Sequence, residues 1–118
     1  MKPYQDAIST ENMLYTTGQI AVNEKGERVG DEIFEQTIKT LENLEAVIES
    51  KGFKKHHIVS LTIYLNDILH DFTDFNKAYI TFFENCKPAR TTIGATLFNP
   101  EFKVEIQAIC NAGIDNRV

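Results

Sequence analysis

Apolar residues recur along this chain with two different periods, and the changes between them outline the predicted elements. Spacings of three and four residues, typical of an amphipathic helix, run from Asp31 to about Ser50 and from about Asp71 to Glu84. Alternation typical of half-buried strands fills most of the remainder. The predicted strands are 13–17, continued after Gly18 by the extended segment 19–22, then 58–65, 90–97 and 103–111.

The ends of both predicted helices carry sequence signals. Asp31 is the predicted N-cap of the first helix, and Gly52 is its C-terminal stop. The second helix ends before Pro88, because a proline disfavours helical backbone at the residue that precedes it.

Strands that flank two helices predict an α+β fold in which both helices pack on one face of a sheet. A length of 118 residues suits a single domain, 1–118. In the last strand Val104 and Ile106 point to one face, and Glu105 and Gln107 point to the other. The sheet face without helices is then either solvated, as antiparallel sheets allow, or buried by oligomerisation.

Composition and charge narrow the partners. The formal net charge is −5, and the longest basic run is a pair of lysines, so a nucleic-acid partner is not expected. No stretch approaches the ~18 apolar residues of a membrane span, and the first ten residues resemble no secretory signal, so we expect a cytoplasmic protein. Cys86 and Cys110 fit no metal or redox spacing, and we expect free thiols, with Cys110 packed inside its strand.

Two charged residues stand out as candidates for chemistry. Arg90 has no acidic neighbour in sequence and can offer two parallel donors to a carboxylate, although for this residue alone a plain surface arginine is the commoner explanation. Glu105 interrupts an apolar strand, which suits a general base or water-orienting carboxylate. The alternatives for Glu105 are a solvated face or a structural pair with an arginine.

The remaining candidates are weaker on their own. Gly18, beside Thr17, indicates either a bulge or a close backbone approach to a ligand. Tyr4 and Asn76 carry no signal in isolation. No phosphate-binding loop, nucleotide fingerprint, nucleophile elbow or zinc pattern occurs, so neither a cofactor nor a metal is expected.

Taken together, several runs resemble the RidA family, also called YjgF and historically described as L-PSP endoribonuclease. The last strand (VEIQAI) and the sequence Pro88-Ala89-Arg90 carry the most specific part of this resemblance. It extends over nearly the whole chain, in runs 14–20, 36–44, 71–79, 82–90 and 104–109. The loop 98–102 departs from the family's usual Leu-Pro version, which bears on substrate preference.

The resemblance implies a chorismate-mutase-like mixed sheet with two helices on one face, assembled as a homotrimer with clefts between subunits. It implies hydrolysis of reactive 2-imino acids, derived from enamines such as 2-aminoacrylate, to 2-keto acids and ammonia. Arg90 would bind the substrate carboxylate and Glu105 would activate a water. The substrate-binding positions would be Tyr4, Thr17, Gly18, Asn76 and Thr92, the last of which replaces a cysteine found in many relatives.

Two other functions remain as alternatives to a deaminase. One is a non-catalytic module that binds a keto acid or another carboxylate at Arg90. The other is an RNA-cleaving translation inhibitor, against which the acidic net charge argues.

Overall fold

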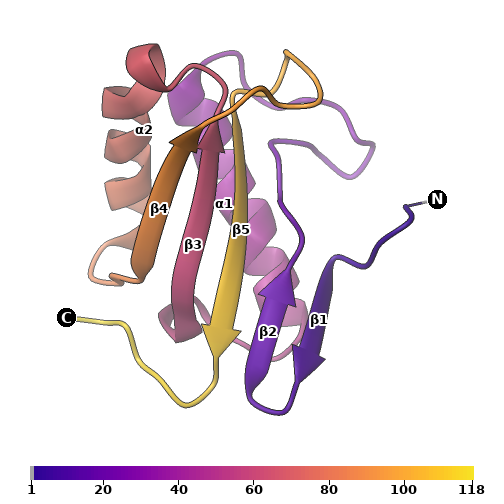
Figure 1. The fold of residues 1–118 in the computed structure, drawn as a ribbon, viewed down its shortest axis with the longest axis vertical. Coiled ribbons are helices and arrows are strands. Elements are labelled where there is room, and N and C mark those ends of the chain that lie inside the picture. Colours follow the sequence, from indigo (N-terminus) through magenta and orange to yellow (C-terminus); the bar gives the residue numbers. More distant parts are fainter. Residues whose placement is uncertain (1) are drawn as a thin grey trace.

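Five strands form one mixed sheet in the computed structural model, which describes residues 2–118 (Figure 1). The spatial order of the strands is β1-β2-β5-β3-β4, with only β3 and β4 parallel. The strands are β1 (Ala7–Thr10), β2 (Met13–Thr16), β3 (Ile58–Leu65), β4 (Ala89–Gly94) and β5 (Val104–Asn111). The helices are α1 (Ile33–Ser50), α2 (Ile68–Phe83) and the short 3₁₀ turn η1 (Lys55–His57).

Both long helices lie against the same face of the sheet, as predicted; in Figure 1, α1 is seen behind the strands and α2 beside β4. α1 packs on β5 and β2, whereas α2 connects the parallel strands β3 and β4 and packs on them and on α1. In β5 the alternate residues Val104, Ile106, Ala108 and Cys110 are buried beneath the helices. The residues between them point to the face that no helix of this chain covers.

The open face of the sheet carries several exposed apolar side chains. They include Ile8 on β1, Tyr15 on β2 and Ile93 on β4. The sequence left two alternatives for this face, solvation and burial by a second copy. In either case the face concerned is partly apolar.

Element boundaries differ from the predicted ones in several places. The segment 19–22 does not continue the first predicted strand, because it forms only isolated bridges, from Gln19 to Ile106 and from Val22 to Arg28. Strand β1 was not predicted, because its four residues, AIST, bury only Ala7. The N-cap of α1 is Glu32 rather than Asp31; the side chain of Asp31 pairs with Arg28 instead. Helix α2 begins three residues earlier than predicted, after Asp67. β4 ends at Gly94 rather than residue 97, at the point where its partner β3 ends.

Other local predictions are confirmed. Gly52 follows the C-cap of α1 with a positive φ of 84°, the conformation that glycine adopts without strain. Cys86 and Cys110 are both buried and unpaired, and Cys110 packs in β5. Across residues 2–118, none of the helices combines the length and apolar character that crossing a membrane demands.

Candidate functional site

Glu105 lies on the open face of the sheet, in the middle strand β5. Its cross-strand neighbour is Tyr64 on β3, and its side chain is about half-buried. Burial raises the pKa of the Glu105 carboxyl, because the charged form loses solvation. A carboxyl with a raised pKa is better matched to proton transfer near neutral pH than an ordinary surface glutamate.

Gly18 lies directly against the Glu105 side chain. After β2, the backbone of Gln19 exchanges hydrogen bonds with Ile106, at 2.8 and 3.0 Å, which holds this segment beside β5. A Cβ atom at residue 18 would lie 2.8 Å from Cδ of Glu105. A side chain at residue 18 would therefore displace the Glu105 carboxylate from its position, whereas close approach of this backbone to a ligand stays a prediction.

A cavity of about 570 Å³ opens over Glu105 and Gly18. Three of the predicted substrate-binding residues, Tyr4, Thr17 and Gly18, line it together with Glu105. The loop after β4 supplies another wall through Phe98 and Phe102, whose rings stack 5.9 Å apart.

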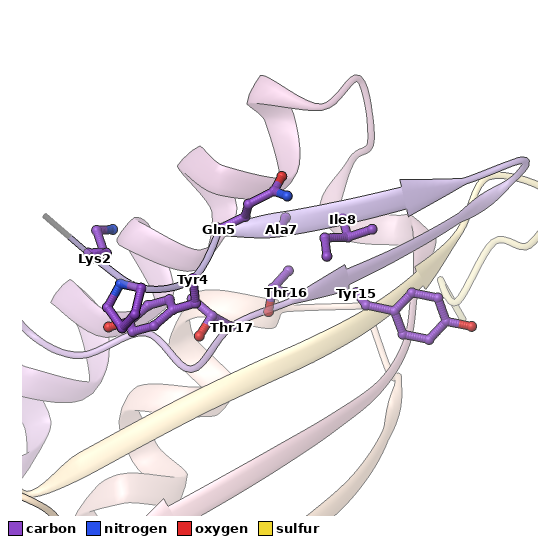
Figure 2. Close-up of a pocket in the computed structure, with 9 residues that line it drawn as sticks. Lys2, Tyr4, Gln5, Ala7, Ile8, Tyr15, Thr16 and Thr17 are labelled. Atoms are coloured by element: carbon purple, nitrogen blue, oxygen red, sulfur yellow. The ribbon is translucent and has the colours of Figure 1, made fainter.

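A second cavity, of about 590 Å³, adjoins the first at the N-terminal segment (Figure 2). The two cavities share Lys2, Tyr4 and Thr17. Figure 2 shows the second one running along β1 and β2 towards Ile8 and Tyr15. The N-terminal segment thus lines both the Glu105 cavity and the part of the open face that carries Ile8 and Tyr15.

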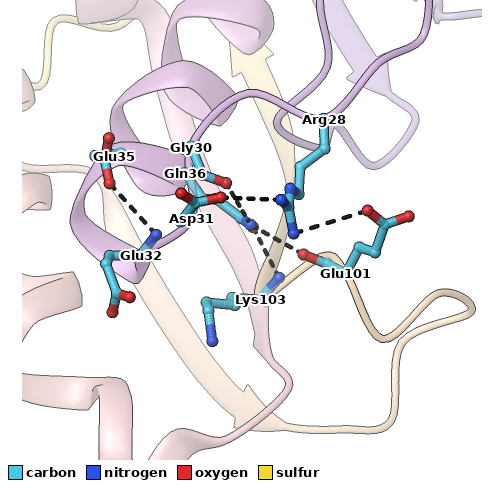
Figure 3. A network of polar contacts seen from close by, with 8 residues as sticks. All are labelled: Arg28, Gly30, Asp31, Glu32, Glu35, Gln36, Glu101 and Lys103. Carbon is cyan, nitrogen blue, oxygen red and sulfur yellow. Dashed lines mark hydrogen bonds and ion pairs between the residues drawn. The ribbon is translucent and has the colours of Figure 1, made fainter.

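Two side-chain amides of α1, those of the buried Gln36 and the partly buried Asn43, fix the loops that surround the Glu105 cavity. Asn43 donates to the carbonyls of Ile20 and Val22 at 2.9 and 2.8 Å, which anchors the segment after Gly18. Gln36 anchors the loop after β4: it donates to the Glu101 carbonyl at 2.9 Å and accepts from the Lys103 N–H at 2.8 Å (Figure 3).

Arg90 lies on the opposite, helix-covered face of the sheet. It pairs with Leu61, a core residue of β3, so its side chain points towards α2. The guanidinium carbon lies over three aromatic rings of α2, those of Tyr79 at 4.6 Å, Phe75 at 5.4 Å and Phe72 at 5.9 Å. Among residues 2–118 the guanidinium has no ion-pair partner and donates no hydrogen bond, so its donors are available to a ligand.

The last two predicted binding residues lie on β4, the strand of Arg90, and on α2, the helix towards which Arg90 points. Thr92 follows Arg90 by two positions on β4 and faces the same side, opposite Ile63. Its Oγ1 is buried without a hydrogen-bond partner in the described part of the chain. Asn76 is partly buried on α2, one helical turn from both Phe72 and Tyr79.

The predicted residues therefore form two half-sites within one chain. The Glu105 half-site contains Tyr4, Thr17, Gly18 and Glu105, and the Arg90 half-site contains Asn76, Arg90 and Thr92. Because Arg90 and Glu105 project from opposite faces of the sheet, a single chain does not bring them together.

Sequence reasoning missed the aromatic surroundings of Arg90. Phe72, Phe75 and Tyr79 follow one another at i, i+3 and i+7, the spacing of one helix face. The helical spacing of apolar residues from 71 to 84 predicts core packing for Phe75 and Tyr79, not a position over Arg90. The available signal was that a helix joining two neighbouring strands packs on both of them, which places its stripe over β4.

Comparisons with known proteins match nearly the whole chain. The sequence model of the family described as endoribonuclease L-PSP matches residues 1–112. A RutC family protein of Pyrococcus horikoshii is 36% identical over 108 residues, which is 91% of this chain and 85% of that protein. A 2-iminobutanoate/2-iminopropanoate deaminase of Escherichia coli is 34% identical over 110 residues, with the same two coverages.

Solved structures have the same fold. Escherichia coli TdcF with bound serine is 30% identical, has a TM-score of 0.86, and covers 94% of this chain and 89% of its own. The YjgF gene product of Escherichia coli is 35% identical with a TM-score of 0.84, over 92% and 87% of the two chains. The protein is thus of the small α+β class in which two helices cover one face of a mixed five-stranded sheet. Within that class, the chain belongs to the RidA family, also called YjgF or L-PSP.

Proposed function

We propose that this protein hydrolyses reactive 2-imino acids, the tautomers of enamines such as 2-aminoacrylate, to 2-keto acids and ammonia. The observation that carries the proposal is the Arg90 guanidinium, which has no anionic partner among residues 2–118 and is free to bind a carboxylate. The likeness to an Escherichia coli 2-iminobutanoate/2-iminopropanoate deaminase supports this substrate class. So does the serine bound to TdcF, because serine also carries an α-carboxylate.

The complete site, in this proposal, forms where two copies of the chain meet. Arg90 and Glu105 occupy opposite faces of one sheet, so a substrate reaches both only if Glu105 comes from the partner subunit. The apolar side chains on the open face favour its burial against other copies. We propose a closed homotrimer, which buries this face in every subunit and gives three equivalent sites.

Each side chain has one task in the reaction. Arg90, with Asn76 and Thr92 beside it, binds the carboxylate in two parallel hydrogen bonds and fixes the imine carbon. The Glu105 carboxylate takes a proton from a water as that water's oxygen bonds to the imine carbon. Glu105 then passes the proton to nitrogen, which gives a carbinolamine. Glu105 next takes the hydroxyl proton of the carbinolamine and delivers it to nitrogen as the C=O bond forms and the C–N bond breaks, so that ammonia and the 2-keto acid leave. Thr17 and Tyr4 line the wall, and Gly18 gives the substrate room beside the carboxylate.

No step in this sequence needs a covalent intermediate or a cofactor, and thiol chemistry at residue 92 is not required. The partners in this proposal are the small carboxylate substrate and further copies of the chain. A cytoplasmic location suits the proposal, because the enamines arise from pyridoxal-phosphate enzymes of amino-acid metabolism.

The experiment generates 2-aminoacrylate with a pyridoxal-phosphate dehydratase acting on serine, in the presence of semicarbazide as a trap for the imine. The protein is expected to divert the imine to pyruvate, and Arg90→Ala to lose about a hundredfold in kcat/KM, because two charge-assisted hydrogen bonds disappear. Arg117→Ala is the matched control, because that arginine is exposed and pairs with Asp115.

If neither wild type nor Arg90→Ala affects pyruvate release while 2-ketobutyrate binds the wild type, the protein is a carboxylate-binding module and the deaminase proposal is wrong. Cleavage of RNA that is indifferent to Arg90→Ala would instead support the function after which the L-PSP family model is described.

A further inference from the structure

Among residues 2–118, the Arg90 guanidinium lies over aromatic rings and has no ion-pair partner. Tyr79 is the closest at 4.6 Å, and it is itself fixed in a row of rings, 5.9 Å from Phe75 and 4.6 Å from Phe83. A cation over a ring face is stabilised by the negative quadrupole of the ring, most strongly where water is excluded. The row therefore gives a partly buried charge its stabilisation without any carboxylate.

This form of support has a consequence for binding. An aromatic ring stabilises the guanidinium charge without supplying a conventional hydrogen-bond acceptor, and the five N–H donors of an arginine lie in the plane of its guanidinium. A supporting aspartate or glutamate would occupy those donors and compete with a substrate carboxylate for them. Aromatic support orients the arginine and leaves the donors unoccupied.

The Tyr79 ring also stays neutral while it does this. Burial raises the pKa of the Tyr79 phenol to about 12, even though the nearby Arg90 acts in the opposite direction. The phenol has no hydrogen-bond partner among the residues that the structure describes. The ring face, rather than the hydroxyl, is thus the part of Tyr79 that acts on Arg90.

We infer that Tyr79 is a positioning residue, which holds Arg90, together with Phe75 and Phe72, in the orientation that receives a carboxylate in two parallel hydrogen bonds. The inference rests on the proposed function for the identity of the ligand. It adds that affinity for the carboxylate depends on the aromatic face at residue 79 and not on its hydroxyl group.

The test is a titration of 2-ketobutyrate into the assembled protein by calorimetry. Tyr79→Leu is expected to weaken binding between about threefold and thirtyfold, the range of one cation–π contact. Tyr79→Phe is expected to bind within about twofold of wild type. In the deaminase assay the loss in Tyr79→Leu is expected in KM, with kcat nearly unchanged, because Glu105 is not affected.

Two further variants separate positioning from general packing. Phe82→Leu is the matched control: that ring lies on the same helix but contacts Phe83 and the ammonium of Lys55 instead of Arg90. Tyr79→3,4,5-trifluorophenylalanine keeps the shape of the ring and weakens its negative face, so it tests the inference even where Tyr79→Leu fails to fold. It is expected to bind more weakly than Tyr79→Phe.

Three outcomes overturn the inference while the proposed function stands: unchanged binding in Tyr79→Leu, an equal loss in Tyr79→Phe, or an equal loss in Phe82→Leu. Equal binding by the phenylalanine and trifluorophenylalanine variants also overturns it. If wild type itself fails to bind 2-ketobutyrate, the carboxylate site and the inference both fall.

Discussion

At the scale of single residues, the proposed chemistry depends on two charged side chains, Arg90 and Glu105. Both are charged groups removed in part from water, and neither has an opposite charge beside it in the described chain. Residue type and strand position made both candidates from sequence. The face of Arg90 could not be predicted, because the run Ala89-Arg90-Thr91-Thr92 has no apolar alternation that fixes which side is buried.

Glu105→Gln is expected to abolish deamination and to stabilise the fold at neutral pH. Because the pKa of Glu105 is raised in the folded state, protonation favours folding: the group's contribution to stability is full below its unfolded pKa and is lost as pH rises through the folded pKa. The advantage of Glu105→Gln in Tm should therefore grow from about pH 4 upward and then level off. Wild-type activity should fall as pH drops through the same folded pKa.

Thermal melts of both proteins across that range check the pH dependence. Glu49→Gln, at an exposed position of α1, is the control. A Tm difference independent of pH would contradict the assignment of burial as the cause of the pKa shift.

At the scale of elements, helices and central strands were predictable and edges were not. Helix periodicity located α1 and α2 because each buries a continuous apolar stripe, and the alternation in β5 separated its two faces correctly. β1 escaped because it is short and only Ala7 is buried. The strand order depends on contacts distant in sequence, so the position of the Gly18 segment beside β5 could not be derived from local pattern.

The anchoring of the loop after β4 to α1 gives a prediction at this scale. Gln36→Leu removes the amide that pairs with the Gly30 and Glu101 carbonyls and the Lys103 N–H, all shown in Figure 3. Leaving these buried groups unpaired should cost about 3 kcal/mol of unfolding free energy, measured by urea denaturation.

The neighbouring contact of Arg28 with Glu101 offers the control for this experiment. It spans 3.7 Å at the surface, so Arg28→Ala should cost less than about 1 kcal/mol. Equal effects of the two substitutions would show that the buried amide is not the anchor of the loop.

At the scale of the whole molecule, the proposed assembly of several copies accounts both for the two half-sites and for the open face of the sheet. One chain presents Arg90 on the covered side of the sheet and Glu105 on the open side. Exposed apolar residues also lie on the open side. In the proposed assembly, further copies of the chain cover the apolar face and complete the site in one step. The central claim is therefore that each site takes Arg90 from one subunit and Glu105 from the partner subunit.

Complementation between two inactive variants tests this claim most directly. Arg90→Ala and Glu105→Gln subunits are co-expressed in equal amounts with different tags, and mixed assemblies are purified through both tags. Their mass in solution should be three times that of the 13.4 kDa chain if the assembly is a trimer. In a closed trimer that contains both variants, one of the three sites then receives one intact Arg90 and one intact Glu105.

We expect assemblies that contain both variants to recover about a third of the wild-type deaminase activity per site, from parents that have almost none. Activity in the mixed assemblies that stays at the level of the two parents would contradict a site shared between subunits.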